Sequence, residues 1–490
     1  MRERELKLVV DNAFVVPDLD DAVDGATLGA PVEVPTEDLY LDTVDLRLAR
    51  WGCTFRHRPA TGWTVKLPRS SDGSMLDREE VTLRGAADAP PARLTTLVSS
   101  LTRRAELVEV ARLDIQRTLR SWRTDDGTEV ALLTDDRVRG VRADGTEVTF
   151  REIEVELAPA ADGHLLDEVG DRLQDAGGSA GRPVPKAIRV LGQDAVAPPD
   201  VVTPGLGKRP SAREVIRAAV AESVAELVTQ LPVARHGLDA TGVGRAGAAA
   251  RRLRADVTTF APLLDESWCD ETLGELTRLV EAFDAVRDDE ALVRQVVDVA
   301  ARHPEVDSEA VAAVLAELEH QRRRDRSRLL RGLRDQRTAE LLDDLVAAAA
   351  EPPARKRAKK PATDVLPKLV RKRWRRLDRA VDRLAADPTP EELDGVRVLA
   401  AAVADGAEAV APAVGKPARR FVKHATRIEW TLDDGAVPHE RLLAIVDRLD
   451  APAGFAAGQL AQQLRTDALP DDGRWRAAHA AMRERADWLG

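Results

Sequence analysis

Charged side chains alternate with their neighbours in several short segments of the first half of the chain. The alternation recurs at Glu3, Glu5 and Lys7, at Arg56 and Arg58, at Thr64 and Lys66, at Arg78 and Glu80, and at Glu152, Glu154 and Glu156. Because the side-chain period of a strand is two, each set points to one side of its strand. A single strand of this kind usually has a solvated face. Here the acids gather in the first and late segments and the arginines in the middle ones, which favours strands that enclose one charged interior.

Carboxylates and arginines that converge on one interior need different partners. Several carboxylates repel one another unless a divalent cation lies among them, whereas arginines and lysines bind the oxygens of a polyanion. A complex of a metal ion with a polyphosphate satisfies both groups. Such a cation also neutralises the charge that develops when a phosphoryl group is transferred to water. The pattern therefore predicts hydrolysis of a metal-bound polyphosphate.

The segments that must position these groups indicate an α+β fold. Residues 1–195 consist mostly of short alternating segments separated by Gly, Pro, Asp and Asn, which is typical of antiparallel strands. A stretch rich in proline and glycine predicts a linker over residues 196–210. Long Ala, Leu, Arg and Glu patterns with helical spacing then predict an all-helical domain over residues 211–490. We expect its helices at 212–230, 245–264, 273–286, 308–346, 363–386 and 391–410.

Two prolines, Pro352 and Pro353, separate two regions of the helical half, each of which could form one antiparallel bundle. The basic connection near residues 351–362 has little apolar surface, so we expect it to be mobile and unpacked. From Glu351 to Arg376 there are eleven lysines and arginines against two acids. This concentration favours a polyanion partner, although a solvated arginine-rich helix surface is the alternative.

Composition narrows the class of protein further. A length of 490 residues predicts two or three domains, and the formal net charge of -11 argues against a protein that coats nucleic acid. The two cysteines, Cys53 and Cys269, are too far apart in sequence to indicate a disulfide framework or a metal cluster. The chain has no long apolar run and no secretory signal pattern, so we expect a cytoplasmic protein without a membrane partner.

Ordered motifs of the first half carry a resemblance to a known family. They are Glu3-x-Glu5-x-Lys7, Tyr40-Leu41-Asp42-Thr43, Thr54-Phe55-Arg56-His57-Arg58, the segment Trp63 to Pro68, and Glu152-Ile153-Glu154. Over residues 1–195 they resemble the CYTH domain of the triphosphate tunnel metalloenzymes. The resemblance implies an eight-stranded antiparallel β-tunnel that binds a triphosphate with Mg or Mn. Most members hydrolyse the triphosphate, and a minority cyclise ATP.

The resemblance also implies roles for individual residues. The metal ligands would be Glu3, Glu5, Asp136, Glu152 and Glu154. The phosphate-binding residues would be Lys7, Arg56, Arg58, Lys66, Arg78, Arg117 and Lys186, and the catalytic pair would be Lys66 and Glu80. No side chain stands out as a general base, so either the metal acidifies the attacking water or an acid such as Glu80 orients it. His57 has the opposite strand phase and is expected to be structural, and Ile115 stands where some members carry a second base.

The helical half carries a second resemblance. Arg251-Arg252-Leu253-Arg254 and Val286-Arg287-Asp288 resemble motifs of the CHAD domain, a two-bundle helical domain that binds polyphosphate. Its possible polyphosphate-binding residues here are Arg251, Arg252, Arg254, Arg287, Arg371 and Arg375. Gly244, Gly247 and Asp394 stand where the family has two histidines and an arginine, and Ala401 and Ala404 stand at further basic positions. We therefore expect weak, salt-sensitive polyphosphate binding.

These observations predict a metal-dependent triphosphatase that acts on inorganic tripolyphosphate or on a small organic triphosphate. Its helical domain would hold polyphosphate or a protein partner. Two alternatives stay open: a non-catalytic protein that binds or is targeted to polyphosphate, and an adenylate cyclase. Retention of both the acidic and the basic set favours the enzyme.

Overall fold

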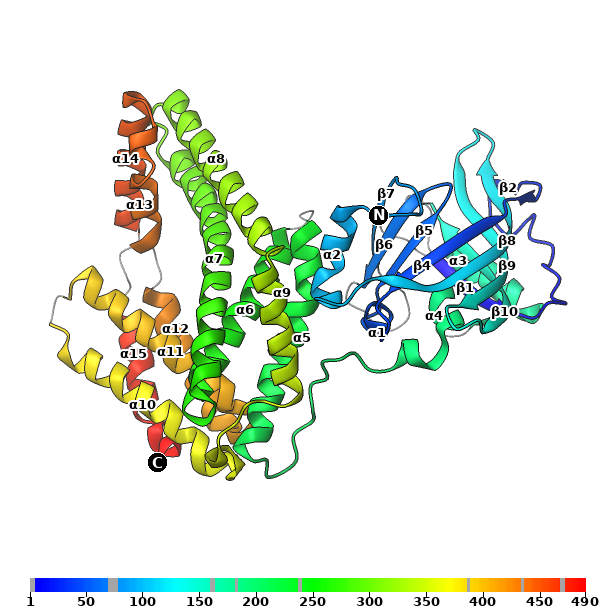
Figure 1. Ribbon diagram of the computed structural model, residues 1–490. Coiled ribbons are helices and arrows are strands. Elements are labelled where there is room, and N and C mark those ends of the chain that lie inside the picture. The colour runs from blue at the N-terminus through cyan, green and yellow to red at the C-terminus, as the bar shows by residue number, and fades with distance from the viewer. Residues whose placement is uncertain are drawn as a thin grey trace. The chain divides into compact units, whose positions relative to one another are not determined.

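The computed structural model describes residues 5–68, 78–158, 164–180, 184–236, 240–385, 388–432, 436–467 and 472–490. The chain divides into two compact units, residues 1–200 and 201–490, and each is described by itself (Figure 1). Among the described helices, none combines the length and the apolar character that crossing a membrane requires.

The first unit is built on one antiparallel sheet. Its eight principal strands are β1 (Glu5–Val10), β4 (Thr36–Asp42), β5 (Thr54–Arg58), β6 (Gly62–Pro68), β7 (Arg78–Leu83), β8 (Val108–Thr124), β9 (Glu129–Arg142) and β10 (Glu147–Leu157). They are ordered β1-β10-β9-β8-β4-β5-β6-β7. The short strands β2 (Ala26–Leu28) and β3 (Val32–Glu33) pair with β8, and β11 (Ser179–Ala180) pairs with β1. The predicted α+β class with an N-terminal antiparallel sheet is confirmed.

The register of this sheet sets charged residues opposite one another. Lys7 on β1 is paired with Glu154 on β10, and Asp136 on β9 is paired with Glu152 on β10. Arg117 on β8 also faces Asp136, from the other side of β9. Directly opposed residues have neighbouring Cβ atoms, so this register brings side chains from separate parts of the sequence into contact range.

The α-helices in the described part of this unit are α1 (Arg47–Arg50), α2 (Ala92–Thr102), α3 (His164–Asp175) and α4 (Lys186–Leu191). Helix α4 packs on the interior face of the sheet, where Val190 joins an apolar cluster with Ile115 and Val138. A Cβ atom at Gly140 would lie 2.3 Å from Val190 Cγ2, so the close approach of α4 requires a glycine there. Ile115, which stands where some members of the family carry a second base, is 2% exposed in this cluster. Its side chain therefore packs against α4.

His57 lies on the opposite face of β5 from its two arginine neighbours. Its ring centroid is 5.0 Å from that of Trp63, and its Nε2 is 3.0 Å from the Gly85 carbonyl oxygen. The buried ring thus ties β5 to the segment after β7, as expected for a structural residue.

The second unit is largely helical, as predicted. Its helices are α5 (Ala212–His236), α6 (Ala240–Phe260), α7 (Glu266–Arg302), α8 (Ser308–Gly332), α9 (Gln336–Ala350), α10 (Ala362–Arg383), α11 (Pro390–Val414), α12 (Lys416–Leu432), α13 (Ala436–Leu443), α14 (Ala451–Asp467) and α15 (Asp472–Arg483). The single helix predicted over 308–346 is wrong, because the chain breaks between α8 and α9. The Asp335 side chain caps the new helix by accepting a hydrogen bond from the Arg337 backbone N–H at 3.2 Å.

The expectation of an unpacked basic connection near residues 351–362 is also wrong. This segment contains a 3-10 helix, η3 (Lys356–Lys359), in which Ala358 is fully buried. Backbone hydrogen bonds hold both of its ends: Arg355 N–H donates to the Leu263 carbonyl at 2.8 Å, and the Lys360 carbonyl accepts from Ala212 N–H at 2.9 Å. Small buried side chains and backbone hydrogen bonds thus pack the segment against the rest of the unit, while its cationic side chains stay exposed.

Candidate functional site

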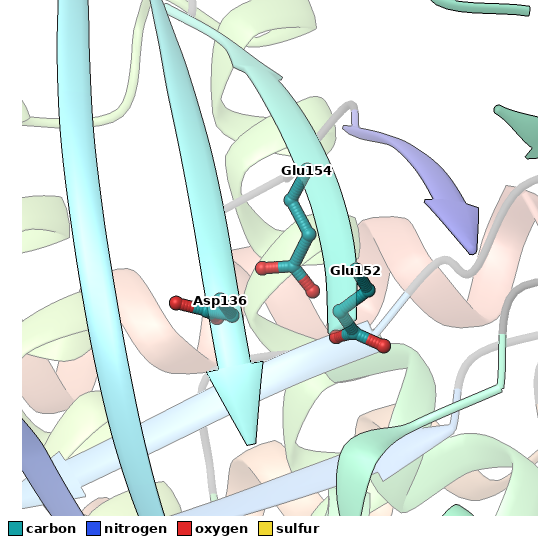
Figure 2. A group of neighbouring side chains, drawn as sticks. All are labelled: Asp136, Glu152 and Glu154. Atoms are coloured by element: carbon teal, nitrogen blue, oxygen red, sulfur yellow. The ribbon is translucent and has the colours of Figure 1, made fainter. Parts of the chain in front are cut away.

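Three carboxylates converge on the interior of the sheet unit. Asp136 on β9 and Glu152 and Glu154 on β10 each place one oxygen within 4.8 Å of the others (Figure 2). Asp136 and Glu152 are fully buried, and Glu154 is half-buried. Clustered carboxylate oxygens are the donors that Mg²⁺ and Mn²⁺ prefer, so these residues fit one divalent cation.

Cationic side chains neutralise this acidic cluster in the structure. The Lys186 ammonium, at the start of α4, lies 3.0 Å from Asp136 Oδ2 and 2.8 Å from Glu154 Oε1, and it also pairs with Glu152. Lys7 forms ion pairs with Glu152 and Glu154. Burial opposes ionisation of Glu154, but the charges of Lys186 and Lys7 prevail and hold its pKa well below the usual value. A lysine ammonium thus lies where the carboxylates could hold a metal ion.

Arg189 also contacts the cluster, and sequence reasoning missed it. Its Nη1 donates to Glu152 Oε2 at 3.2 Å. The available signal was its spacing, because Arg189 follows Lys186 by three residues and so lies on the same face of α4.

Arg117 connects the acidic cluster to the basic side of the interior. Its Nε and Nη2 donate to the two oxygens of Asp136 at 2.8 and 2.7 Å, a bidentate arrangement. Although burial disfavours the charged guanidinium, the hydrogen bonds and charge of Asp136 raise the pKa of Arg117.

A second buried acid, Asp38 on β4, organises the arginines of β5. Arg58 donates to it from Nε at 2.6 Å and from Nη2 at 2.8 Å, and Arg56 donates from Nη1 at 3.1 Å. Burial alone would raise the pKa of Asp38, but Arg58 and Arg56 lower it. Sequence reasoning missed Asp38, although it shares its strand face with Tyr40 and Asp42 of a motif that was recognised.

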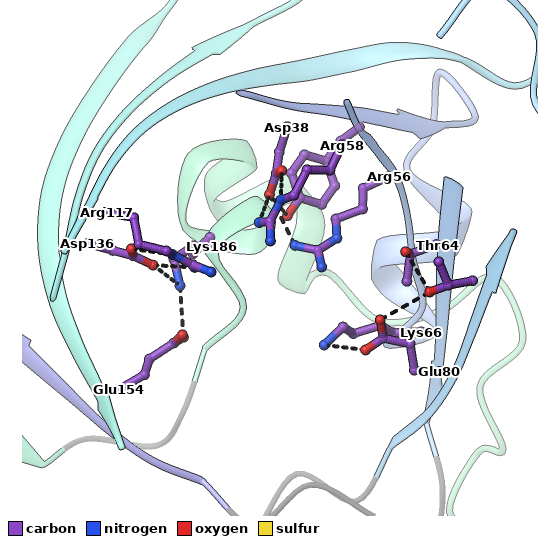
Figure 3. Close-up of polar contacts among 12 residues, drawn as sticks. Asp38, Arg56, Arg58, Thr64, Lys66, Glu80, Arg117, Asp136, Glu154 and Lys186 are labelled. Carbon is purple, nitrogen blue, oxygen red and sulfur yellow. Dashed lines mark hydrogen bonds and ion pairs between the residues drawn. The ribbon is translucent and has the colours of Figure 1, made fainter. Parts of the chain in front are cut away.

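A third charged group lies on β6 and β7. Lys66 Nζ is 2.9 Å from Glu80 Oε2, and Thr82 Oγ1 donates to Glu80 Oε1 at 3.3 Å. Figure 3 shows this pair across the interior from Asp136 and Glu154, with the arginines of β5 between the two groups. The curved sheet thus directs three charged groups into one shared space.

The remaining predicted residues of this site are less fully described. Glu3 lies outside the described residues. Glu5 and Arg78 lie on β1 and β7, but their side chains are outside the described part of the structure.

The arginines predicted to bind polyphosphate are spread over several helices of the second unit. Arg251 pairs with Asp284, Arg287 donates to Asp288 Oδ1 at 2.8 Å, and Arg252 pairs with Asp256 and Glu408. Arg371 donates to the carbonyl of the last residue, Arg254 is half-buried on α6, and Arg375 is exposed on α10. Acids of the same unit therefore already pair with three of the six arginines.

Comparison with known families agrees with both units. A family model described as the CYTH domain matches residues 1–186, and one described as the CHAD domain matches residues 218–442. The chain therefore has a CYTH domain followed by a CHAD domain, and both resemblances are confirmed.

Individual relatives and structures are also similar. The chain is 31% identical over 345 residues to the uncharacterized proteins Rv2226 and MT2285 of two Mycobacterium tuberculosis strains, H37Rv and CDC 1551. The match covers 65% of this chain and 64% of each relative, so it spans just under two thirds of their length. A solved structure, PptA from Streptomyces chartreusis, is similar with a TM-score of 0.44 and 19% identity, over 57% of this chain and 99% of that chain.

Proposed function

We propose that this protein is a divalent-metal-dependent triphosphatase that hydrolyses inorganic tripolyphosphate or a small organic triphosphate in the tunnel of its CYTH domain. The observation that carries the proposal is the convergence of Asp136, Glu152 and Glu154 next to half-buried arginines. Acids that fit a cation, beside guanidinium groups that fit phosphate oxygens, match the two halves of a metal–triphosphate complex. The CHAD domain would bind polyphosphate weakly.

Residues of the chain would divide the work of hydrolysis. Asp136, Glu152 and Glu154, together with Glu3 and Glu5, would hold Mg or Mn, which supplies charge neutralisation and acidifies a bound water. Arg56, Arg58 and Arg117 would donate to phosphate oxygens and fix the triphosphate along the interior.

Lysines and one further acid would complete the site. Lys7 and Lys186, which contact the acidic cluster, would turn to phosphate oxygens when a triphosphate enters. Lys66 would add a phosphate contact on the opposite side, and Glu80 would orient the attacking water from there.

One observation favours a second candidate, a non-catalytic protein that binds polyphosphate. Lys186, Lys7 and Arg189 already neutralise the acidic cluster, so the interior could hold an anion through its basic side alone. In that case the tunnel would bind triphosphate equally well with and without a divalent cation.

The discriminating experiment measures product release with the full chain. Tripolyphosphate, ATP and long-chain polyphosphate are each incubated with Mg or Mn, and phosphate and cyclic AMP are quantified. The proposal predicts phosphate release that requires the metal and ceases with a chelator. Binding without release would favour the non-catalytic protein, and cyclic AMP formation from ATP would identify a cyclase.

A further inference from the structure

The interior of the CYTH domain adjoins a pocket whose lining includes two of the arginines described above, Arg58 and Arg117. This pocket has a volume of about 600 Å³ and is formed by the start of β4, the turn between β5 and β6, and the middle of β8. Its apolar lining includes Val34, Pro35, Pro59, Ile115 and Leu119. Val34 is 40% exposed, so its side chain is accessible to a ligand in the pocket.

The pocket begins where the phosphate-binding side of the interior ends. Arg58 and Arg117 both line it, and each directs Nε and Nη2 to an interior carboxylate. Within the described structure, Nη1 of each guanidinium makes no hydrogen bond and remains available to a phosphate oxygen. Arg117 also contacts Asp136 of the acidic cluster directly. A triphosphate held at the cluster and at these arginines would therefore present its far end to the pocket.

The charge of the pocket argues against a longer phosphate chain at that end. Among the described residues that line it, only Arg58 and Arg117 are cationic. Two acids also line the pocket, and each pairs with an arginine outside the lining: Glu37 with Arg112, and Asp114 with Arg139. Additional phosphates would therefore enter an apolar space without a counter-charge, whereas an uncharged organic group would bury apolar surface there.

We propose that this pocket holds the organic group of a triphosphate ester and makes the tunnel selective for organic triphosphates over inorganic chains. The inference rests on the proposed triphosphatase function and narrows its substrate class. Val34, Pro59 and Leu119 would contact a flat, uncharged group, and Arg58 and Arg117 would bind the phosphate to which it is attached.

Two variants of the full chain test the proposal by different means. Val34→Asp places a charge in the pocket, and Ala60→Trp fills it from the exposed turn between β5 and β6. Val44→Asp is the matched control, because Val44 is 84% exposed and follows the opposite end of β4. For each protein, kcat/KM is measured with tripolyphosphate, ATP, thymidine triphosphate and cytidine triphosphate in Mg or Mn.

We expect both pocket variants to lower kcat/KM for at least one organic triphosphate about tenfold and to leave tripolyphosphate hydrolysis within about twofold. The control should change neither. Equal effects on all substrates, no effect, or a wild-type protein that hydrolyses tripolyphosphate alone would overturn the inference while leaving the triphosphatase function intact. A wild-type protein that hydrolyses none of the four substrates would instead refute the proposed function.

Discussion

The two units of this protein use charged side chains in opposite ways. In the CYTH domain, Asp38, Arg58, Asp136 and Lys186 come from separate strands and a helix, are mostly buried, and converge on one interior. In the CHAD domain, the corresponding candidates are partly exposed, and three of the six pair with acids nearby, as Arg287 does with Asp288. Burying charge is costly unless it is compensated, so the convergence in the first unit is the stronger indication of a ligand site.

Two carboxylates show the same contrast. The pKa of Asp38 is lowered, because two arginines outweigh the effect of burial. In the CHAD domain, burial raises the pKa of Asp256 to about 6, since Arg252 is shared with Glu408 and offsets burial only in part. The cationic partners of Asp38 in the CYTH domain therefore outweigh the effect of burial, and those of the buried Asp256 in the CHAD domain do not.

The largest expected effect concerns the acidic cluster of the CYTH domain. Glu154→Gln should lower metal-dependent phosphate release more than about 100-fold, since loss of even an outer-shell partner of a metal costs about 10- to 100-fold. Glu156→Gln is the control, because this residue lies on the same strand face but is exposed. Steady-state phosphate release over a metal titration measures both. Equal activity of the two variants would remove Glu154 from the metal site.

Next in size is the effect of the arginines on β5. Arg58→Ala should weaken triphosphate binding about 10- to 150-fold, which corresponds to the loss of a charge-assisted hydrogen bond worth roughly 1.5–3 kcal/mol. Titration calorimetry with tripolyphosphate measures this change. His57→Ala should leave the triphosphate affinity nearly unchanged, because that ring lies on the other face of β5. Similar losses from both variants would mean that the interior face has been misassigned.

The raised pKa of Asp256 predicts a pH effect on the stability of the CHAD domain. Burial raises the pKa of Asp256 to about 6 in the folded state, above the ordinary value of 3.8, so the folded state retains the proton more strongly than the unfolded state. The free energy of unfolding should therefore fall by about 2 kcal/mol as pH rises from 4 to 6. Asp256→Asn should remove this part of the pH dependence, which chemical denaturation at a series of pH values will show. An unchanged slope in the variant would contradict the assignment.

The smallest expected effect is polyphosphate binding by the CHAD domain. In the full chain with Arg56→Ala and Arg58→Ala, remaining binding of long polyphosphate should be weak and should fall about tenfold between 50 and 200 mM salt, as expected for two phosphate contacts. Additional Arg251→Ala should weaken it further. Tight, salt-independent binding would show that the ion pairs of these arginines with nearby acids do not reduce the affinity of the CHAD domain for polyphosphate.

The sequence predicted which charged side chains share a strand face, but it did not predict the buried acid Asp38 that pairs with the arginines of β5. Strand alternation predicted one shared side for Glu152 and Glu154, because a period of two is visible in a short segment. Asp38 escaped notice because its partners Arg56 and Arg58 become its neighbours only when β4 pairs with β5. Tertiary packing of this kind leaves no local pattern.

The break between α8 and α9 was also missed by the sequence prediction. The sequence prediction was one continuous helix over residues 308–346, but the buried positions of α8 and α9 would lie on opposite sides of such a helix. The break depends on the Asp335 cap and on Arg235, which is buried on α5 and donates to the Leu333 carbonyl at 2.6 Å. That contact depends on the packing of α5 against this break, which the local sequence does not reveal.

The most direct test of the account is a measurement of Mn²⁺ binding by the full chain without substrate. Calorimetry or electron paramagnetic resonance would compare the wild type with the double variant Glu152→Gln, Glu154→Gln and with Arg58→Ala. We predict one Mn²⁺ per chain in the wild type, loss of that binding in the double variant, and retention in Arg58→Ala, because the arginine contacts Asp38 and not the acidic cluster. Equal Mn²⁺ affinity in the wild type and the double variant would contradict the claim that these carboxylates form the metal side of a triphosphate site.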